Sequence, residues 1–285
     1  MYKKIRLPIN CLQVGLCVAG AFPDYFTDLW GRGYSDTPLD CRHDVRLFAS
    51  QILLALMSSP LSWMGNSNTF FIVAFSLGGL ISLAFTGAFP ESVRSLVLLG
   101  PAGLIRKRPD GYDDNYMHQP KLAPSLESLR ENVRQILGAI PCGPALNMQT
   151  DKKRVVSSEQ GPPRVEKSFD IGGIIQWQFD HHQGHIHSFQ DTVRYGPLQK
   201  REDLWGKVCD IIAGRTRPDS ALHNTKLLVF FGRDDDVVVG EETTEDILKL
   251  LGRIPTRWAW VPLYPNSEKI TQTILSFQRS KLSEA

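Results

Sequence analysis

The stretch IVAFSLGGL, residues 72–80, constrains the fold of this chain more than any other segment. A run of β-branched and aromatic residues leads into Ser76, with the small residues Ala74 before it and Gly78 and Gly79 after it. A serine on a sharp turn between a strand and a helix needs small neighbours, because the turn is strained and crowded. The stretch therefore predicts a strand, an exposed serine and a helix that begins directly after it. A turn that only joins strand to helix is the alternative.

Three other short apolar runs resemble the one that precedes Ser76. The four runs together cover residues 69–75, 93–99, 226–231 and 257–262. Nearly continuous apolar character is typical of strands that are covered on both faces, as in a parallel sheet. Helical patterns lie between or after these runs, and such alternation indicates an α/β protein. The predicted fold is a mostly parallel central sheet flanked by helices.

The predicted helices cover residues 43–59, 77–90, 241–252 and 267–278. In the first, apolar residues recur on one stripe, as in a helix that packs on a core. The third begins with acidic residues and ends at a glycine, which are favourable at the two ends of a helix.

The alternation of strands and helices is lost between about residues 103 and 222, where proline, glycine and polar residues gather. We interpret this segment as a mainly helical cap over the carboxyl edge of the sheet, where open α/β sheets bind their ligands. The predicted organisation is a core at 1–102 and 223–285, with the cap inserted at 103–222.

Composition and charge argue against several classes of function. The net charge of +2 and the scattered basic residues give no reason to expect a nucleic-acid partner. No segment approaches the ~20 apolar residues of a membrane-spanning helix, so stable membrane insertion is not expected. Five cysteines without a C-x-x-C pair predict reduced thiols and a cytoplasmic chain. The basic and then apolar residues 1–21 imitate a signal peptide, so secretion stays open as an alternative.

Three motifs, in this order, resemble those of the α/β-hydrolase superfamily of lipase-like and esterase-like serine hydrolases. DLWGRGYSD at 28–36 resembles the D-x-x-G-x-G-x-S loop of that superfamily. The segment 74–103 resembles its nucleophile elbow with the following helix and strand, and LLVFFGRDDDVVV at 227–239 resembles its acid-bearing turn. The resemblance covers about 28–103 and 222–280 and implies an α/β-hydrolase fold with a cap.

The resemblance implies hydrolysis of a carboxylic ester or a related acyl bond, without a cofactor. Ser76 would attack the carbonyl carbon, the Leu77 N–H would hold the oxyanion, and Asp235 would orient a histidine. Asp234 and Asp236 flank the acid, so its position is assigned to within one residue. Three adjacent aspartates could also ligate Mg²⁺ or Ca²⁺, but the role of the acid accounts for them better and no metal site is predicted.

Two parts of such a site are missing from the sequence. All seven histidines precede Asp235, whereas the resemblance implies a histidine after the last strand. Residues 1–27 contain no histidine, so the H-G turn that would supply a second oxyanion N–H is absent too. These gaps favour a second hypothesis, a catalytically impaired hydrolase fold kept as a binding module. An incomplete sequence of an active enzyme, with a Gly-His lost between Leu263 and Tyr264, would leave the same gaps.

The cap contains a histidine-rich segment, FDHHQGHIHSFQ, at 179–190. His182 could replace the missing base, and His181 with His185 could bind a metal ion, but we interpret the segment as solvated. Trp177 and His182 are the candidates to line a substrate pocket. Aromatic residues in the cap favour a lipophilic small-molecule ester as substrate, although such residues more often form a core.

Overall fold

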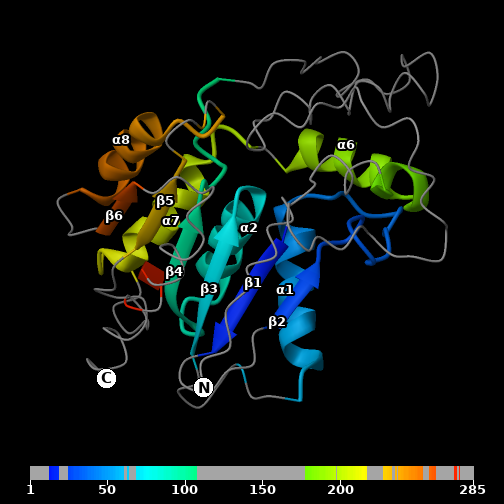
Figure 1. Ribbon diagram of the computed structural model, residues 1–285. Coiled ribbons are helices and arrows are strands. Elements are labelled where there is room, and N and C mark those ends of the chain that lie inside the picture. The colour runs from blue at the N-terminus through cyan, green and yellow to red at the C-terminus, as the bar shows by residue number, and fades with distance from the viewer. Residues whose placement is uncertain are drawn as a thin grey trace.

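The computed structural model describes residues 13–18, 25–60, 63, 69–107, 177–196, 198–216, 227–232, 235, 237–252, 257–260, 273–274 and 276. Within them a six-stranded sheet has the strand order β2-β1-β3-β4-β5-β6 (Figure 1). The strands are β1 (Gln13–Val18), β2 (Tyr25–Asp28), β3 (Phe70–Phe75), β4 (Val93–Leu99), β5 (Leu228–Phe231) and β6 (Arg257–Trp260).

The strands from β3 to β6 are parallel, whereas β1 is antiparallel to both β2 and β3. The prediction of a mostly parallel sheet is therefore confirmed. The four apolar runs of the sequence correspond to β3, β4, β5 and β6, and each begins and ends within two residues of the predicted strand.

Both faces of the sheet are covered, which explains the nearly continuous apolar character of its strands. Successive side chains of a strand point to opposite faces. In β3, Phe70 and Ile72 belong to the larger core on one face, and Phe71 and Val73 belong to a smaller core on the other. Ile274, near the C-terminus, packs into the smaller core.

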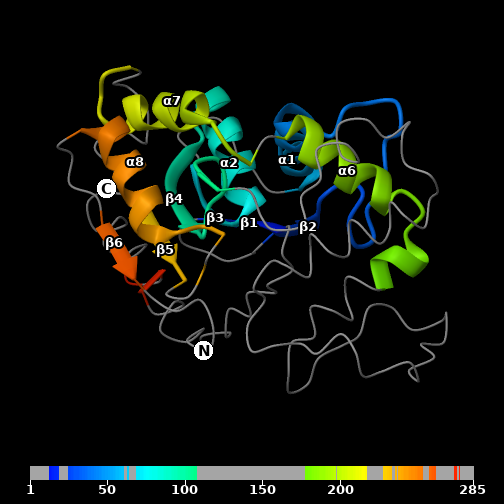
Figure 2. The ribbon, with the colours of Figure 1, turned by 90° about the horizontal axis from the view of Figure 1, so that it is seen from above.

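The described helices include α1, α2, α7 and α8 along the face of the larger core (Figure 2). The helices are α1 (Val45–Ser58), α2 (Leu77–Ala88), α6 (His185–Tyr195), α7 (Glu202–Ile212) and α8 (Gly240–Leu251). The first three predicted helices are α1, α2 and α8. Residues 273, 274 and 276 are helical, and the rest of the helix predicted at 267–278 lies outside the described residues.

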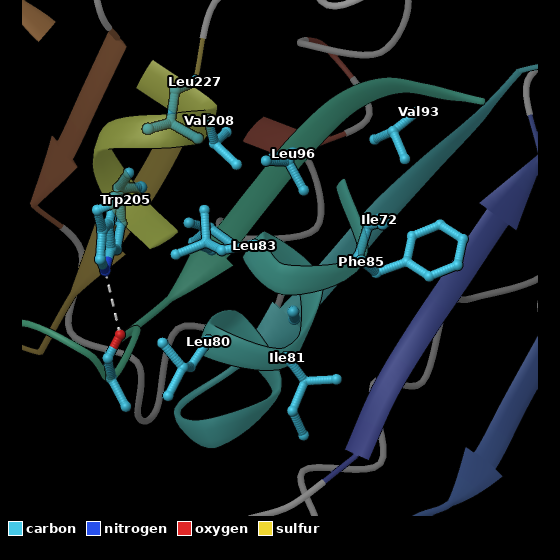
Figure 3. Close-up of a cluster of buried hydrophobic side chains, with 14 of the residues drawn as sticks. Ile72, Leu80, Ile81, Leu83, Phe85, Val93, Leu96, Trp205, Val208 and Leu227 are labelled. Carbon is cyan, nitrogen blue, oxygen red and sulfur yellow. Dashed lines mark hydrogen bonds between the residues drawn. The ribbon is translucent and has the colours of Figure 1, made fainter. Parts of the chain in front are cut away.

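The larger core is centred on α2, whose Leu80, Leu83 and Phe85 are buried, and Phe85 lies beside Ile72 of β3 (Figure 3). Trp205 of α7 is also buried, and its indole N–H donates to the Ala102 carbonyl at 3.4 Å. Burial of side chains of this size is the main source of stability in a domain.

Helix α7 lies inside the range predicted as a cap, yet it packs against α2 and α8. These contacts place α7 in the helical layer of the core. We therefore propose that an insertion within 103–222 ends before Glu202. In the described part of the chain, no helix combines the length and the apolar character that crossing a bilayer requires.

Candidate functional site

Ser76 occupies a strained turn between β3 and α2. Its backbone has φ 50° and ψ −117°, a conformation that non-glycine residues rarely adopt. The Ser76 N–H donates to the Leu99 carbonyl at 2.9 Å, and the Ser76 carbonyl accepts from the N–H groups of Gly79 at 2.9 Å and Ala102 at 3.0 Å. The backbone of the serine is thus fixed from three sides. The predicted strand, the turn at the serine and the following helix are confirmed; Ser76 is half-buried, and its role as nucleophile stays a prediction.

The residues around Ser76 are small because neighbouring segments pack closely against them. Gly79 lies against the next loop, since a Cβ placed there would be 2.8 Å from the Cβ of Pro101. Ala74 is buried in the strand and Gly78 in the first turn of α2. Leu77 is the first residue of α2, and its N–H points along the helix axis as one of the N–H groups that find no partner within a helix.

Asp235 lies in the turn that connects β5 to α8. Its Oδ1 accepts hydrogen bonds from the backbone N–H groups of Val237 at 3.0 Å and Val238 at 2.9 Å, which fix the carboxylate. The turn is tight, because a Cβ on Gly232 would be 3.0 Å from the Cβ of Asp235. Asp234 and Asp236 lie outside the described residues, so the choice of Asp235 among the three stays a prediction.

The ends of β3, β4 and β5 lie level at one edge of the sheet. The N–H of Ser76 donates to Leu99, and the N–H of Gly100 in turn donates to Phe230 at 2.8 Å. Neighbouring strands are about 4.8 Å apart, so β3 and β5 are separated by about 10 Å. An imidazole that bridges a hydroxyl and a carboxylate by two hydrogen bonds spans roughly 8 Å. The spacing of these strands is therefore compatible with a histidine between Ser76 and Asp235.

Strand β1 explains why an H-G turn has no place beside the serine. Because β1 is antiparallel to β3, Val14 pairs with Ala74 while Val18 pairs with Phe70. The end of β1 consequently lies at the edge of the sheet opposite Ser76. A turn that follows β1 cannot supply an oxyanion donor at the serine.

The loop that follows β2 begins at the same edge as Ser76, because β2 and β3 run in the same direction. Asp28 Oδ2 accepts from the Tyr34 N–H at 3.0 Å, and the Asp28 carbonyl accepts from the Ser35 hydroxyl at 2.6 Å. Gly33 has φ 56°, and a Cβ there would overlap the Asp28 carboxylate. The D-x-x-G-x-G-x-S motif thus describes a closed loop, with the aspartate and serine as its internal hydrogen-bonding groups.

The histidine-rich segment contacts this loop. His182 Nε2 lies 2.7 Å from the Ser35 carbonyl oxygen, and His185 Nδ1 lies 3.0 Å from that of Gly31. His185 is only 1% exposed. The interpretation of the segment as solvated is therefore wrong for His185, although His181 is exposed. The sequence showed the cluster of histidines, but their partners are backbone carbonyls about 150 residues earlier in the chain.

The described geometry gives the two predicted pocket residues other neighbours. The Trp177 ring lies 5.4 Å from the rings of both Tyr34 and His181, and the Gln178 side chain beside it accepts from the Gly33 N–H at 3.0 Å. The hydrogen bond of His182 likewise goes to the loop. A role of either residue in a pocket stays a prediction.

A metal ion is not suggested by the arrangement of the histidines. His181 ends a short helical turn and His185 begins α6, so the two do not share the face of one continuous helix. Over the residues that the structure describes, no group of three or more metal-binding side chains gathers.

Burial governs the ionisation of two groups at the contact between loop and α6. It lowers the pKa of His185 to about 3, with a further contribution from the nearby charge of Arg32. Burial also lowers the pKa of Arg32 to about 9. His185 is therefore neutral at pH 7, while Arg32 carries its charge.

A groove of about 730 Å³ lies elsewhere, at the C-terminal end of α2. It is lined by Pro90 from the turn after α2 and by Glu202, Lys207 and Asp210 of α7. Since α2 begins directly after Ser76, this groove lies one helix length away from the serine.

Comparisons with known proteins agree with this geometry. The sequence profile of the family described as alpha/beta hydrolase fold matches residues 25–240. A 2-hydroxy-6-oxo-2,4-heptadienoate hydrolase of Pseudomonas putida is 32% identical over 98 residues, which are 33% of this chain and 32% of that protein. A 2-hydroxymuconate semialdehyde hydrolase of Pseudomonas sp. strain CF600 is 32% identical over 99 residues, 34% of this chain and 32% of that protein. The chain spans about a third of the length of these curated relatives.

A solved structure from a study of carboxylesterases of Nitrososphaera gargenis resembles the chain with a TM-score of 0.55 at 9% identity, covering 92% of this chain and 81% of that one. At this identity the likeness concerns the fold alone. The family profile spans β2, the serine turn, and β5 with the acid turn. The chain belongs to the α/β hydrolase fold family.

Proposed function

We propose that the protein is a serine hydrolase that cleaves a carboxylic ester, or a related acyl bond, of a lipophilic small molecule. The observation that carries the proposal is the Ser76 turn, in which a non-glycine residue is held at φ 50° by three backbone hydrogen bonds. Strain of this kind costs of order 1–3 kcal/mol and persists where a function requires it. A connecting turn would not need a serine at this position.

In the proposed reaction the Ser76 Oγ attacks the acyl carbon and the Leu77 N–H stabilises the oxyanion. Asp235 orients a histidine that takes the proton of the serine and passes it to the leaving group. Water then cleaves the acyl-enzyme by the same route. The level ends of β3 and β5 support this division of roles, because they place the serine turn and the acid turn two strands apart.

No histidine of the proposed site is identified among the residues that the structure describes, and His118 and His223 lie outside them. The rings of His182 and His185 are bound to loop carbonyls, so neither is free to serve Ser76 in this arrangement. These contacts support the alternative proposal, a catalytically impaired hydrolase fold that binds its ligand without turning it over. The antiparallel β1, whose following turn lies at the opposite edge of the sheet from Ser76, supports the same alternative.

A fluorophosphonate probe separates the two proposals, because it labels a serine only when a base activates it. We expect labelling of the wild-type chain and none of Ser76→Ala. Ser82→Ala is the matched control, since Ser82 is buried in the same helix and donates only to the Gly79 carbonyl. A folded wild-type chain that resists the probe would overturn the hydrolase proposal and leave the binding module.

The names of the two Pseudomonas relatives suggest a second candidate for the substrate class. Their names denote hydrolases of an oxo-dienoate and of a muconate semialdehyde. Turnover of p-nitrophenyl butyrate and of 2-hydroxy-6-oxo-2,4-heptadienoate, measured side by side, tests which class the site accepts. We expect the ester to be preferred, and a preference for the dienoate would replace the ester proposal.

The cytoplasmic location is part of the same proposal. Two of the five cysteines, Cys41 and Cys209, are free thiols in the described structure, the first exposed and the second buried. Free thiols are usual in a reducing compartment. Fractionation of the cells that make the protein would test the location, and recovery from the secreted fraction would contradict it.

A further inference from the structure

The loop at 28–44 and helix α6 meet without space between them. A Cβ on Gly31 would overlap the side chain of Ser188, and a Cβ on Gly184 would overlap that of Thr37. The contact therefore depends on glycine on both sides. A buried polar group that finds no partner in such a contact is costly.

Arg32 brings a buried positive charge into this contact. Its side chain is 3% exposed and donates to the Gly31 carbonyl at 3.0 Å, to Ser188 Oγ at 2.5 Å and to Thr192 Oγ1 at 3.2 Å. All three acceptors are neutral, and within the described structure Arg32 forms no ion pair with a carboxylate. A charge buried in this way makes the neighbourhood unfavourable for a second positive charge.

His185 lies beside that charge with one ring nitrogen unused. The Gly31 carbonyl can only accept, so Nδ1 of His185 carries the proton and donates. Nε2 is then the nitrogen that acid would protonate. It is buried and has no hydrogen-bond partner among the described residues. A proton on Nε2 would create a buried donor without an acceptor, next to Arg32.

His43 is linked to the same network through Ser188. Its Nε2 lies 2.8 Å from the Pro38 carbonyl and must donate, so in neutral His43 the Nδ1 accepts from the Ser188 hydroxyl at 2.7 Å. Protonated His43 would donate from Nδ1, and the hydroxyl would turn to the Trp30 carbonyl at 3.1 Å. The Ser188 hydroxyl can therefore reorient to accept from a protonated His43. No described group can accept from a protonated Nε2 of His185 in the same way.

The other titratable and charged groups around the contact do not offset a proton on His185. Besides Arg32, the loop and the start of α1 carry Asp28, Asp36, Asp40, Arg42, His43, Asp44 and Arg46, and the α6 segment carries Asp180, His181, His182, His187, Asp191 and Arg194. Asp36, Asp40, Arg42, Asp180 and His181 are exposed. The Asp28 carboxylate accepts from the Tyr34 N–H, Asp44 pairs with Arg46, and Asp191 pairs with Arg194. The charge of Arg32 and that of a protonated His182 both oppose protonation of His185.

We propose that the contact between the loop at 28–44 and α6 is a proton-sensitive latch, closed while His185 is neutral and opened when acid protonates it. The contact is stable while His185 is neutral, because the imidazole then donates to the Gly31 carbonyl and places no second charge beside Arg32. It opens because an exposed imidazolium is stable in water and a buried one beside Arg32 is not. This inference concerns the packing of the loop on α6 and does not depend on the proposed hydrolysis.

Hydrogen exchange of backbone amides, measured by mass spectrometry at pH 7.5 and pH 5.0, tests the latch. The pKa of His185 is about 3 in the closed state, and an exposed imidazole has a pKa of about 6.5. The equilibrium constant for opening should therefore be about 30-fold larger at pH 5.0 than at pH 7.5. After correction for intrinsic exchange rates, we expect this loss of protection in peptides that cover 28–44 and 185–195. Peptides that cover β3 and β4 report on the core and should stay better protected than the contact at both pH values.

Two variants make the test specific. His185→Gln retains a donor for the Gly31 carbonyl but cannot titrate, so its protection should be the same at both pH values. His181→Gln is the matched control, because His181 is exposed and bonds only to the Trp177 carbonyl, and it should behave like the wild type. Equal acid-induced losses in wild type and His185→Gln would overturn the proposal.

A measurement on the wild type alone covers the case in which His185→Gln does not fold. The C2 proton of each histidine exchanges with D₂O at a rate that reports the pKa of its ring. We expect His185 to show no titration between pH 5 and pH 8 while the core is folded. A titration midpoint near 6.5 for His185 would overturn the proposal.

Discussion

The serine turn and the contact between loop and α6 lie along the same edge of the sheet but are built differently. The serine turn is held by backbone hydrogen bonds to Leu99, Gly79 and Ala102, all made by neutral groups. The contact between loop and α6 is held by the side chains of Arg32, His185 and Ser188, on segments about 150 residues apart. The serine turn should be insensitive to acid and to changes in distant residues. The contact between loop and α6 should respond to both.

The largest effect is expected from Gly31→Ala. Gly31 has φ 75°, which costs an alanine about 1–2 kcal/mol, and the new Cβ would overlap Ser188, which adds about 1–3 kcal/mol. We expect the free energy of unfolding in urea to fall by about 3 kcal/mol. Gly252→Ala is the control, since φ is 74° there but no atom lies within 4 Å of the added Cβ. Equal losses of unfolding free energy in Gly31→Ala and Gly252→Ala would show that Gly31 is not closely packed against Ser188.

Acid should weaken the contact between loop and α6 next most strongly. The pKa of His185 is lowered on folding, so below about pH 6.5 the unfolded chain binds a proton that the folded chain does not. Stability is therefore complete above pH 6.5 and is lost as the pH falls towards 3. We expect His185 to account for about 2 kcal/mol of the loss between pH 7 and pH 5. Urea titrations of wild type and His185→Gln should diverge by this amount, and parallel curves would contradict it.

The two regions also differ in how far the sequence predicts them. The Ser76 turn was predictable because its determinants lie within a few residues: an apolar run, small residues at 74, 78 and 79, and a helical pattern. Local sequence encodes such a turn through steric limits on the backbone. The acid turn is equally local, because the hydrogen bonds of Asp235 go to residues two and three positions later, but its choice as the acid rests on the family resemblance and stays a prediction.

The contact between loop and α6 was not predictable in this way. The histidines of the cap suggested solvent, metal or catalysis, because nothing local marks a backbone carbonyl as a partner. The one available signal was glycine. Gly31 and Gly184 each make room for a side chain of the other segment, but a single sequence cannot tell such a glycine from one in an ordinary loop. The sequence made no prediction for β1, and its antiparallel direction depends on strand pairing, which is a long-range property.

A smaller effect of opposite sign is expected at the serine turn. Ser76→Gly removes the cost of a positive φ, so we expect the free energy of unfolding to rise by about 1 kcal/mol. Ser82→Gly, in the middle of α2, should lower it by about 1 kcal/mol, because glycine is unfavourable within a helix. Thermal unfolding of both variants measures the difference. A loss of stability in Ser76→Gly would mean that the turn is not strained.

The smallest change in stability is expected from Asp235→Asn, which also separates structure from chemistry at the acid turn. An asparagine Oδ1 can still accept from the N–H groups of Val237 and Val238, so the free energy of unfolding should change by less than about 1 kcal/mol. An amide is a poor partner for a histidine that becomes charged during the reaction, so labelling of Ser76 by a fluorophosphonate should slow by a factor on the order of 10³ or more. Unchanged labelling would remove Asp235 from the proposed site and leave it as the residue that closes the turn. Because asparagine keeps both acceptor bonds of the Asp235 side chain, the acid turn should lose chemistry without losing its fold, whereas Gly31→Ala should disrupt the packing of the loop on α6.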